Sequence, residues 1–293
     1  MKLGIDMGGM SIKMGLVNEE NKIIGRITIP TDLTVPYQTL VERMADAVRQ
    51  MLENAGMTLE QCGGIGIGSP GTIDAKQGVI LYSNNFGWEN VPIVEELKKH
   101  LDTRIEIAND ADAAALGEVC AGAAEGAENA VLLTLGTGVG SGVILDKKIF
   151  RGAMPGGCEL GHLSIRYDGI RCTCGRKGCL EAYASASALL RIAREKAAEH
   201  PESIMNEMCG NDLEQMNGKI PFDAAKAGDE AGMETVKEYE GYLACGIANV
   251  INTFRPEKVI LGGGVAAQRE NLTAPLKGLV KDMCFGGSHG YIA

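Results

Sequence analysis

The sequence predicts a protein of the α/β class that is built from two similar units. Short strands alternate with amphipathic helices along the 293 residues. Residues 2–29 and 130–150 share one pattern, in which a strand, a Gly-rich turn, a second strand, a turn and a third strand follow one another. A repeated pattern of this kind indicates a duplicated domain, and we expect a cleft between the two copies.

The composition is that of an ordinary globular protein, and it disfavours several kinds of partner. Hydrophobic residues make up 45% of the chain and charged residues 23%. The net charge of −10 disfavours nucleic acid and anionic membranes, because both need a basic face. No stretch reaches the roughly 18 apolar residues that cross a bilayer. Asp6 interrupts any N-terminal signal, and the odd number of cysteines fits reduced thiols, so we expect a cytoplasmic location.

The first Gly-rich turn has the features of a phosphate-binding loop. Apolar residues alternate with smaller or polar ones over residues 2–29, which predicts three short strands. The turn between the first two strands runs Asp6-Met-Gly-Gly-Met-Ser-Ile-Lys13. Backbone N–H groups of such a turn can face a phosphate, and Asp6 can hold a metal ion or its water. A plain hairpin turn is the alternative interpretation.

The next part of the chain predicts a helix, two short strands and a polar loop. The loop, Tyr82-Ser-Asn-Asn-Phe-Gly-Trp88, carries side-chain amides and the only Trp, which are typical of polyol binding and also of any capped loop. The predicted elements are a helix over 36–55, strands over 64–68 and 78–81, a turn over 69–74, and a helix from Pro92 to about His100.

Asn109 and Asp110 lie at a predicted strand-to-helix junction. The strand covers residues 104–108, and an Ala-rich helix covers 111–124. Ligands of α/β proteins bind at the carboxyl ends of strands, so Asp110 is a candidate site residue. Either residue is also a good helix N-cap, and the two interpretations are compatible.

The second half of the chain predicts a second and a third Gly-rich turn. The turn over 136–140 lies between strands 131–135 and 141–145, and a further strand starts at Lys148. Two phosphate-binding turns that face one cleft fit a nucleoside triphosphate better than either turn alone. Beyond them we expect helices over 181–198, 229–253 and 268–283, an irregular polar segment over 200–220, and a strand over 257–261 that leads into the turn Gly262-Gly-Gly-Val265.

The segment between residues 159 and 181 predicts a structural zinc site. His162, Cys172, Cys174 and Cys179 have the spacing His-x9-Cys-x-Cys-x4-Cys, and three thiolates with one imidazole complete a tetrahedral shell. A full protein shell leaves no position for a reactive water, which favours a structural role over a catalytic one. Three buried thiols beside an unrelated His are the alternative. Glu159 and Glu181 flank the cluster, and we expect the metal to position them.

Together these motifs resemble the ROK family (repressor, open reading frame, kinase), and most of all its bacterial glucokinases. The resemblance covers nearly the whole chain and implies the actin-like ATPase fold, with two ribonuclease-H-like α/β domains around a central cleft. We expect these domains to be residues 1–116 and 117–293. The resemblance to the family rests on seven motifs. They are Glu159-Leu-Gly-His162, Cys172-Thr-Cys-Gly175, Gly178-Cys-Leu-Glu181, Asp6-Met-Gly-Gly9, Asn109-Asp-Ala-Asp-Ala-Ala114, Leu135-Gly-Thr-Gly-Val-Gly140 and Leu261-Gly-Gly-Gly264.

The resemblance also implies a role for each matching residue. Asp110 matches the general base that takes the proton from the C6 hydroxyl of a hexose as this hydroxyl attacks the γ-phosphate of ATP. His162 has two implied tasks, because one ring nitrogen binds Zn²⁺ and the other faces a sugar hydroxyl. The implied sugar contacts are Gly71, Thr72, Asn85, Asn109, Glu159, His162 and Glu181. The implied contacts to ATP and its Mg²⁺ are Asp6, Gly8, Gly9, Met10, Ser11, Lys13, Gly136, Thr137, Gly138, Gly262, Gly263 and Gly264.

The chain departs from the family pattern at two places. Met10 stands where the first phosphate turn usually has Thr, and we hypothesise that the Ser11 hydroxyl replaces the missing one. Relatives continue past the position of Ala293 with a further strand and a helix, so we expect consequences for stability and closure.

The sequence leaves the sugar and the partner open. Glucose is the first expectation, and N-acetylmannosamine, N-acetylglucosamine, allose and fructose are alternatives. A sugar-sensing regulator of the same family would carry an N-terminal helix-turn-helix, whereas here the first phosphate strand begins at Lys2. A catalytically inactive sugar-binding protein is the third hypothesis. We expect a homodimer or tetramer with small-molecule ligands only.

Overall fold

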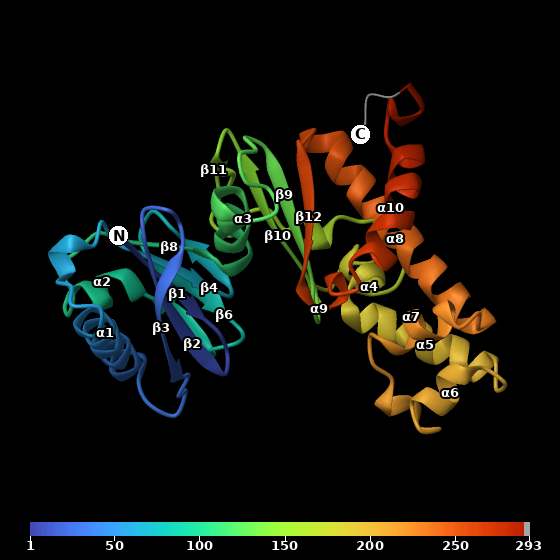
Figure 1. Ribbon diagram of the computed structural model, residues 1–293, viewed down its shortest axis with the longest axis horizontal. Helices are drawn as coiled ribbons and strands as arrows, with labels where there is room; N and C mark the ends of the chain where they lie inside the picture. Colours follow the sequence, from blue (N-terminus) through green and yellow to red (C-terminus); the bar gives the residue numbers. More distant parts are fainter. Residues whose placement is uncertain (290–293) are drawn as a thin grey trace. The chain divides into compact units, whose positions relative to one another are not determined.

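The computed structural model describes residues 1–289, which separate into two compact units (Figure 1). Unit 1 comprises Met1–Glu128 and Gly142–Cys158, and unit 2 comprises Asn129–Ser141 and Glu159–Ala293. The domain boundary after residue 116 stays a prediction. Part of the C-terminal stretch in which the chain departs from the family pattern lies outside the described residues.

Unit 1 is built on a five-stranded sheet with the order β3-β2-β1-β4-β8. The strands β1 (Lys2–Met7), β2 (Ser11–Val17) and β3 (Ile23–Pro30) form the predicted antiparallel meander. The strands β4 (Ile65–Ser69) and β8 (Ile105–Asn109) extend it in parallel with β1. The carboxyl ends of three parallel strands therefore meet at one edge, where ligands of α/β sheets bind.

The core of unit 1 lies beneath an amphipathic helix, as its apolar spacing predicts. The helix α1 (Tyr37–Asn54) buries one face that includes Leu40, Met44 and Val48. Two shorter helices, α2 (Ile93–Lys98) and α3 (Asp110–Ala121), and a single 3₁₀ turn (Leu59–Gln61) complete the helical part of the described unit.

A second, three-stranded sheet corrects two predictions in unit 1. Its strands are β5 (Thr72–Asp74), β6 (Val79–Ser83) and β7 (Trp88–Val91), with β6 in the centre. The predicted turn over 69–74 thus contains a strand, and the polar loop leads into another. Trp88 packs against Phe86 with ring centroids 4.8 Å apart and against Tyr37 at 6.1 Å. The indole is therefore core packing rather than a platform for a polyol.

The repeated pattern at residues 130–150 is confirmed as strands β9 (Ala130–Leu135), β10 (Val139–Leu145) and β11 (Lys148–Ile149). They belong to a four-stranded sheet with the order β11-β10-β9-β12, and the boundary between the units passes through β10. The strand β12 (Lys258–Gly262) runs parallel to β9 and pairs Gly262 with Thr134. The second and third Gly-rich turns therefore follow neighbouring parallel strands.

Helices make up most of unit 2 and correct two further predictions. The predicted helix over 181–198 is two helices, because Ser185 is extended and its hydroxyl caps the second by accepting from the Ala188 N–H at 3.1 Å. The segment 200–220, predicted to be irregular, contains a short helix over Ile204–Met208 that Ser203 caps and that buries Met205, and the rest is a 3₁₀ turn, other turns and irregular residues apart from the first residue of the next helix at Ile220. The helices are α4 (Glu181–Ala184), α5 (Ala186–Glu199), α6 (Ile204–Met208), α7 (Ile220–Lys226), α8 (Glu230–Phe254), α9 (Gly263–Ala266) and α10 (Glu270–Met283), with 3₁₀ turns at Leu160–His162, Leu213–Gln215 and Gly287–His289.

Within residues 1–289, no helix combines the length and the apolar character that a membrane span requires.

Candidate functional site

Asp110 lies at the carboxyl edge of the sheet in unit 1. The ladder places Asp6 of β1 opposite Gly68 of β4 and pairs Ser69 with Asn109 of β8, so Asp110 follows directly at the same edge. Although its side chain is exposed, it lines a cavity of about 1120 Å³ in this unit. The concave surroundings displace water and raise the pKa of Asp110 above the ordinary value, and the charge of Asp6 raises it further.

A hydrogen bond from the Ala111 N–H opposes this shift but does not reverse it. The donor lies 2.8 Å from Asp110 Oδ1. Asp110 is therefore a carboxylate of raised basicity at a strand end, which is the property that a general base needs.

Asn109 fixes two parts of the same edge. Its Oδ1 accepts from the Ala111 N–H at 2.9 Å, so the N-cap interpretation is confirmed. Its Nδ2 donates to the Gly71 carbonyl at 3.2 Å, which brings Gly71 and Thr72 next to the start of α3. Gly71 has a φ of +115°, and a Cβ there would lie 2.2 Å from the Tyr82 carbonyl oxygen, so only glycine fits. The sugar contacts of these residues stay predictions.

The first Gly-rich turn is a tight hairpin connection between β1 and β2. The Gly8 N–H donates to the Ser11 carbonyl at 3.0 Å. Thr31 holds the other side, because its hydroxyl donates to the Gly8 carbonyl at 2.6 Å and its N–H to the Met10 carbonyl at 3.1 Å. Thr31 was not among the predicted site residues, since nothing in the sequence marks a contact 23 residues away. The geometry is that of a hairpin, and its binding of phosphate stays a prediction.

Three further predicted contact residues lie in or next to this turn. The Met10 side chain is 90% exposed and packs into no core. A Cβ at Gly9 would lie 3.9 Å from Asn85 Nδ2, so the predicted sugar contact Asn85 is close to the turn. Lys13 Nζ lies 3.8 Å from Asp6 Oδ2 in an exposed ion pair.

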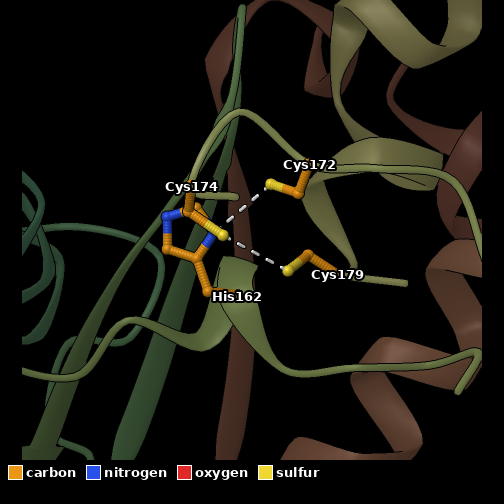
Figure 2. A group of neighbouring side chains, drawn as sticks. All are labelled: His162, Cys172, Cys174 and Cys179. Carbon is orange, nitrogen blue, oxygen red and sulfur yellow. Dashed lines mark hydrogen bonds between the residues drawn. The ribbon is translucent and has the colours of Figure 1, made fainter. Parts of the chain in front are cut away.

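In unit 2, the four predicted metal ligands converge (Figure 2). The ligand atoms of His162, Cys172, Cys174 and Cys179 all lie within 4.8 Å of one another. The Cys174 and Cys179 sulfurs are 3.7 Å apart, and the Cys172 sulfur is 3.7 Å from His162 Nδ1. A tetrahedral Zn²⁺ with metal–sulfur bonds of roughly 2.3 Å requires ligand separations of about 3.8 Å. The donor set and its spacing therefore fit this metal.

The thiols need a cation in order to ionise. Burial raises the pKa of Cys179 to about 12 and raises the pKa of Cys172, whereas a backbone hydrogen bond lowers the pKa of the exposed Cys174. Zinc binds thiolates, so binding at this cluster must release protons. His162 faces the sulfurs through Nδ1, which leaves Nε2 as the nitrogen for the predicted sugar contact.

Glu159 and His162 are held by a single 3₁₀ turn over Leu160–His162. The His162 N–H donates to the Glu159 carbonyl at 3.0 Å. The Leu160 N–H donates to the buried Ser141 hydroxyl of β10 at 2.9 Å, which anchors the turn to the sheet. Glu159 is exposed and His162 half-buried, as ligand contacts require.

Glu181 connects the metal cluster to the second Gly-rich turn. Its Oε2 accepts from the Val139 N–H at 3.1 Å, and its Oε1 accepts from the Thr173 hydroxyl at 3.0 Å. A Cβ at Gly138 would lie 2.2 Å from Oε2. Glu181 is a predicted sugar contact, and its hydrogen bond with Thr173, which lies between two metal ligands, was not predicted.

The third Gly-rich turn lies against the end of β9. Gly263 has a φ of +82°, and a Cβ there would lie 2.6 Å from the Leu135 carbonyl oxygen. Only glycine can make this approach, which keeps the turn Gly262–Gly264 next to Gly136, the residue that follows Leu135. The structure thus brings together two of the three predicted nucleotide turns within unit 2.

Comparison with known proteins gives a consistent family. A model of the ROK family matches residues 2–292. The glucokinase of Thermotoga maritima is 37% identical over 281 residues, which are 96% of this chain and 87% of that protein. The xylose repressor of Caldicellulosiruptor bescii is 29% identical over 283 residues, which are 97% of this chain and 70% of that protein.

Solved structures agree with this family. The chain resembles a ROK family glucokinase from Streptomyces griseus in complex with glucose and AMPPNP, with a TM-score of 0.77, 31% identity, and coverage of 98% of this chain and 90% of that one. It also resembles the ROK hexokinase from Thermus thermophilus, with a TM-score of 0.81, 32% identity, and coverage of 96% and 88%. These similarities confirm the predicted actin-like ATPase fold.

Proposed function

Since the chain belongs to the ROK family, we propose that it is an ATP-dependent sugar kinase that converts glucose to glucose 6-phosphate. The glucokinases among its relatives support this substrate, and AMPPNP in the Streptomyces griseus structure supports ATP as the donor. The observation that carries the proposal is the position and raised pKa of Asp110 at the carboxyl edge of β8.

Asp110 acts as the general base in this proposal. It accepts the proton of the C6 hydroxyl while the oxygen of this hydroxyl attacks the γ-phosphorus, and ADP leaves. Phosphoryl transfer depends on positioning and charge neutralisation more than on covalent chemistry, so the protein need supply only one base, well-placed N–H groups and a site for the Mg²⁺ of ATP.

The cofactors follow from the same residues. Asp6 would hold the Mg²⁺ that accompanies ATP, directly or through water, and the Gly-rich turns would face the phosphates. Zn²⁺ on His162 and the three cysteines supplies no reaction step and orders the loop that carries Glu159 and Glu181. These carboxylates would accept hydrogen bonds from the sugar hydroxyls. A sugar of the wrong configuration would leave them unpaired, which disfavours its binding.

A sugar-sensing regulator is the second candidate, because xylose repressors are among the relatives. The chain covers 70% of the Caldicellulosiruptor bescii repressor. Such a protein needs the sugar contacts but has no use for a general base. Asp110 therefore favours the kinase. We also propose that the protein forms a homodimer and acts in the cytoplasm.

The test is a coupled assay of ADP release over a panel of hexoses and amino sugars. We expect glucose to give the highest kcat/KM, with Asp110→Asn as the matched inactive control. If no sugar stimulates ADP release, the protein is not a sugar kinase. If another sugar, such as N-acetylmannosamine, exceeds glucose, the kinase assignment stands and the substrate assignment is wrong.

A further inference from the structure

We propose that Glu181 is a positioning residue that couples the zinc cluster to the phosphate turn Gly136–Gly138, so that metal and nucleotide each tighten the binding of the other. The inference rests on the proposed function, because it takes this turn to be a nucleotide contact. It concerns only groups within unit 2.

One side of the coupling is the contact between Glu181 and the turn. Glu181 Oε2 accepts from the Val139 N–H, which directly follows the turn, at 3.1 Å. The carboxylate occupies the space that a side chain at Gly138 would need, since a Cβ there would lie 2.2 Å from Oε2. The carboxylate thus lies directly against Gly138 and is linked to the turn by the hydrogen bond from the Val139 N–H.

The other side is the contact between Glu181 and the metal loop. Thr173 lies between the ligands Cys172 and Cys174, and its hydroxyl donates to Glu181 Oε1 at 3.0 Å. The Cys172 thiol also donates to Oε1 at 3.4 Å, but a metal-bound thiolate has no proton to donate. In the zinc-loaded protein Thr173 is thus the donor that links Oε1 to the loop.

The orientation of the turn explains why its position matters for a phosphate. The Ala186 N–H donates to the Gly136 carbonyl at 2.8 Å, and the Ser187 hydroxyl donates to the Thr137 carbonyl at 2.9 Å. These two carbonyls therefore point toward the start of α5. In a trans peptide the C=O and N–H groups are antiparallel, so the N–H groups of Thr137 and Gly138 point the opposite way. They form the donor pair that a phosphate would meet.

Two supports thus hold the turn, and only one of them depends on the metal. The start of α5 fixes the carbonyl side through Ser187, whereas Glu181 fixes the following residue and is itself fixed by the metal loop. Coupling between two ligands is reciprocal and commonly amounts to about 5- to 150-fold. With a single carboxylate as the link we expect the lower end, on the order of 5- to 10-fold.

The experiment measures zinc affinity of the zinc-loaded, full-length protein by chelator competition, with and without saturating AMPPNP and Mg²⁺. We expect AMPPNP to tighten zinc binding on the order of 5- to 10-fold in the wild type. Thr173→Val removes the hydroxyl with little change of volume and should bring this ratio to about 1. Ser187→Ala, the matched control on the metal-independent support, should keep the ratio while weakening AMPPNP binding itself.

Calorimetry of AMPPNP binding distinguishes a failure of the coupling from a failure of the proposed kinase function. A wild-type protein that binds AMPPNP but shows no change in zinc affinity refutes the coupling and leaves the kinase proposal standing. If Thr173→Val leaves the effect of AMPPNP on zinc affinity unchanged, Glu181 is not the link between the two sites. Absence of AMPPNP binding by the zinc-loaded protein overturns the proposed function and the coupling with it.

Discussion

Glu240 is a buried acid that should make the stability of the protein depend on pH. It lies on α8 with 6% of its surface exposed, and among residues 1–289 its Oε1 has no hydrogen-bond partner. Burial disfavours the charged form and raises the pKa from 4.5 to about 7. The Glu240→Gln variant replaces this acid with a neutral group of nearly the same shape.

The sign and size of the effect follow from the shift. Because the pKa of the folded state lies above that of the unfolded state, the stabilisation from this group is complete below the unfolded value of 4.5 and is lost as the pH rises through 7. The shift corresponds to a cost of about 3 kcal/mol when the carboxylate is ionised at pH 8. Glu240→Gln should therefore stabilise the protein at pH 8 by up to ~3 kcal/mol, and by much less at about pH 5.

The assay is urea unfolding followed by circular dichroism at several pH values from about 5 to 8. The matched control is Glu238→Gln, since Glu238 lies on the same helix but is half-buried and reached by solvent. This control measures how much of any stability change comes from replacing a carboxylate on this helix with an amide. A difference between Glu240→Gln and the wild type that stays constant across this range would refute the argument from burial.

Five further predictions concern the site. Asp110→Asn should lower kcat by about 10²- to 10⁴-fold and raise the thermal midpoint, because ionising a carboxylate of raised pKa costs folding free energy; a kcat near that of the wild type would remove Asp110 as the base. For the same reason, kcat/KM should fall at a higher pH on the acid side than an ordinary Asp would give, and a pH–rate profile measures this. Met10→Thr should leave the KM for ATP within about 3-fold if the Ser11 hydroxyl replaces that of Thr, and a large fall in KM shows that it does not. Gly138→Ala should displace the Glu181 carboxylate from the Val139 N–H and cost about 0.5–1.5 kcal/mol, the worth of one hydrogen bond, in calorimetric AMPPNP binding or unfolding, so a variant equal to the wild type in both contradicts this contact. Removing zinc with a chelator should raise the sugar KM, whereas a chelated and still folded protein with unchanged KM would contradict the role of the metal in positioning Glu159 and Glu181.

The sequence was sufficient where the determining interactions are local. The four zinc ligands lie within 18 residues, and their spacing alone predicts the cluster. Asp110 was predictable because a strand end followed by an Ala-rich helix is a local pattern. The capping of α3 by Asn109 was predictable for the same reason.

The remaining features depend on contacts between distant parts of the chain. Trp88 becomes core packing only because Tyr37 lies against it, and no pattern near Trp88 reveals this. The helical run breaks at Ser185, which has an extended backbone, and the next residue, Ala186, donates its N–H to the distant Gly136 carbonyl at 2.8 Å. Glu181 reaches Val139 across 42 positions, so its structural contact was not predictable from the segment around it.

The stability cost at Asp110 bears on the choice between a kinase and a regulator. Both kinds of ROK protein need a sugar site, so the zinc cluster and the carboxylates around it do not distinguish them. A carboxylate of raised pKa at a strand end has the property that a general base needs, whereas sensing a sugar requires no proton acceptor. Asn109 is the N-cap of α3, and Asn in place of Asp110 could still accept the Ala111 N–H and hydrogen bonds from a sugar without the cost of a charge. The carboxylate at position 110 therefore supports the proposed kinase over the regulator.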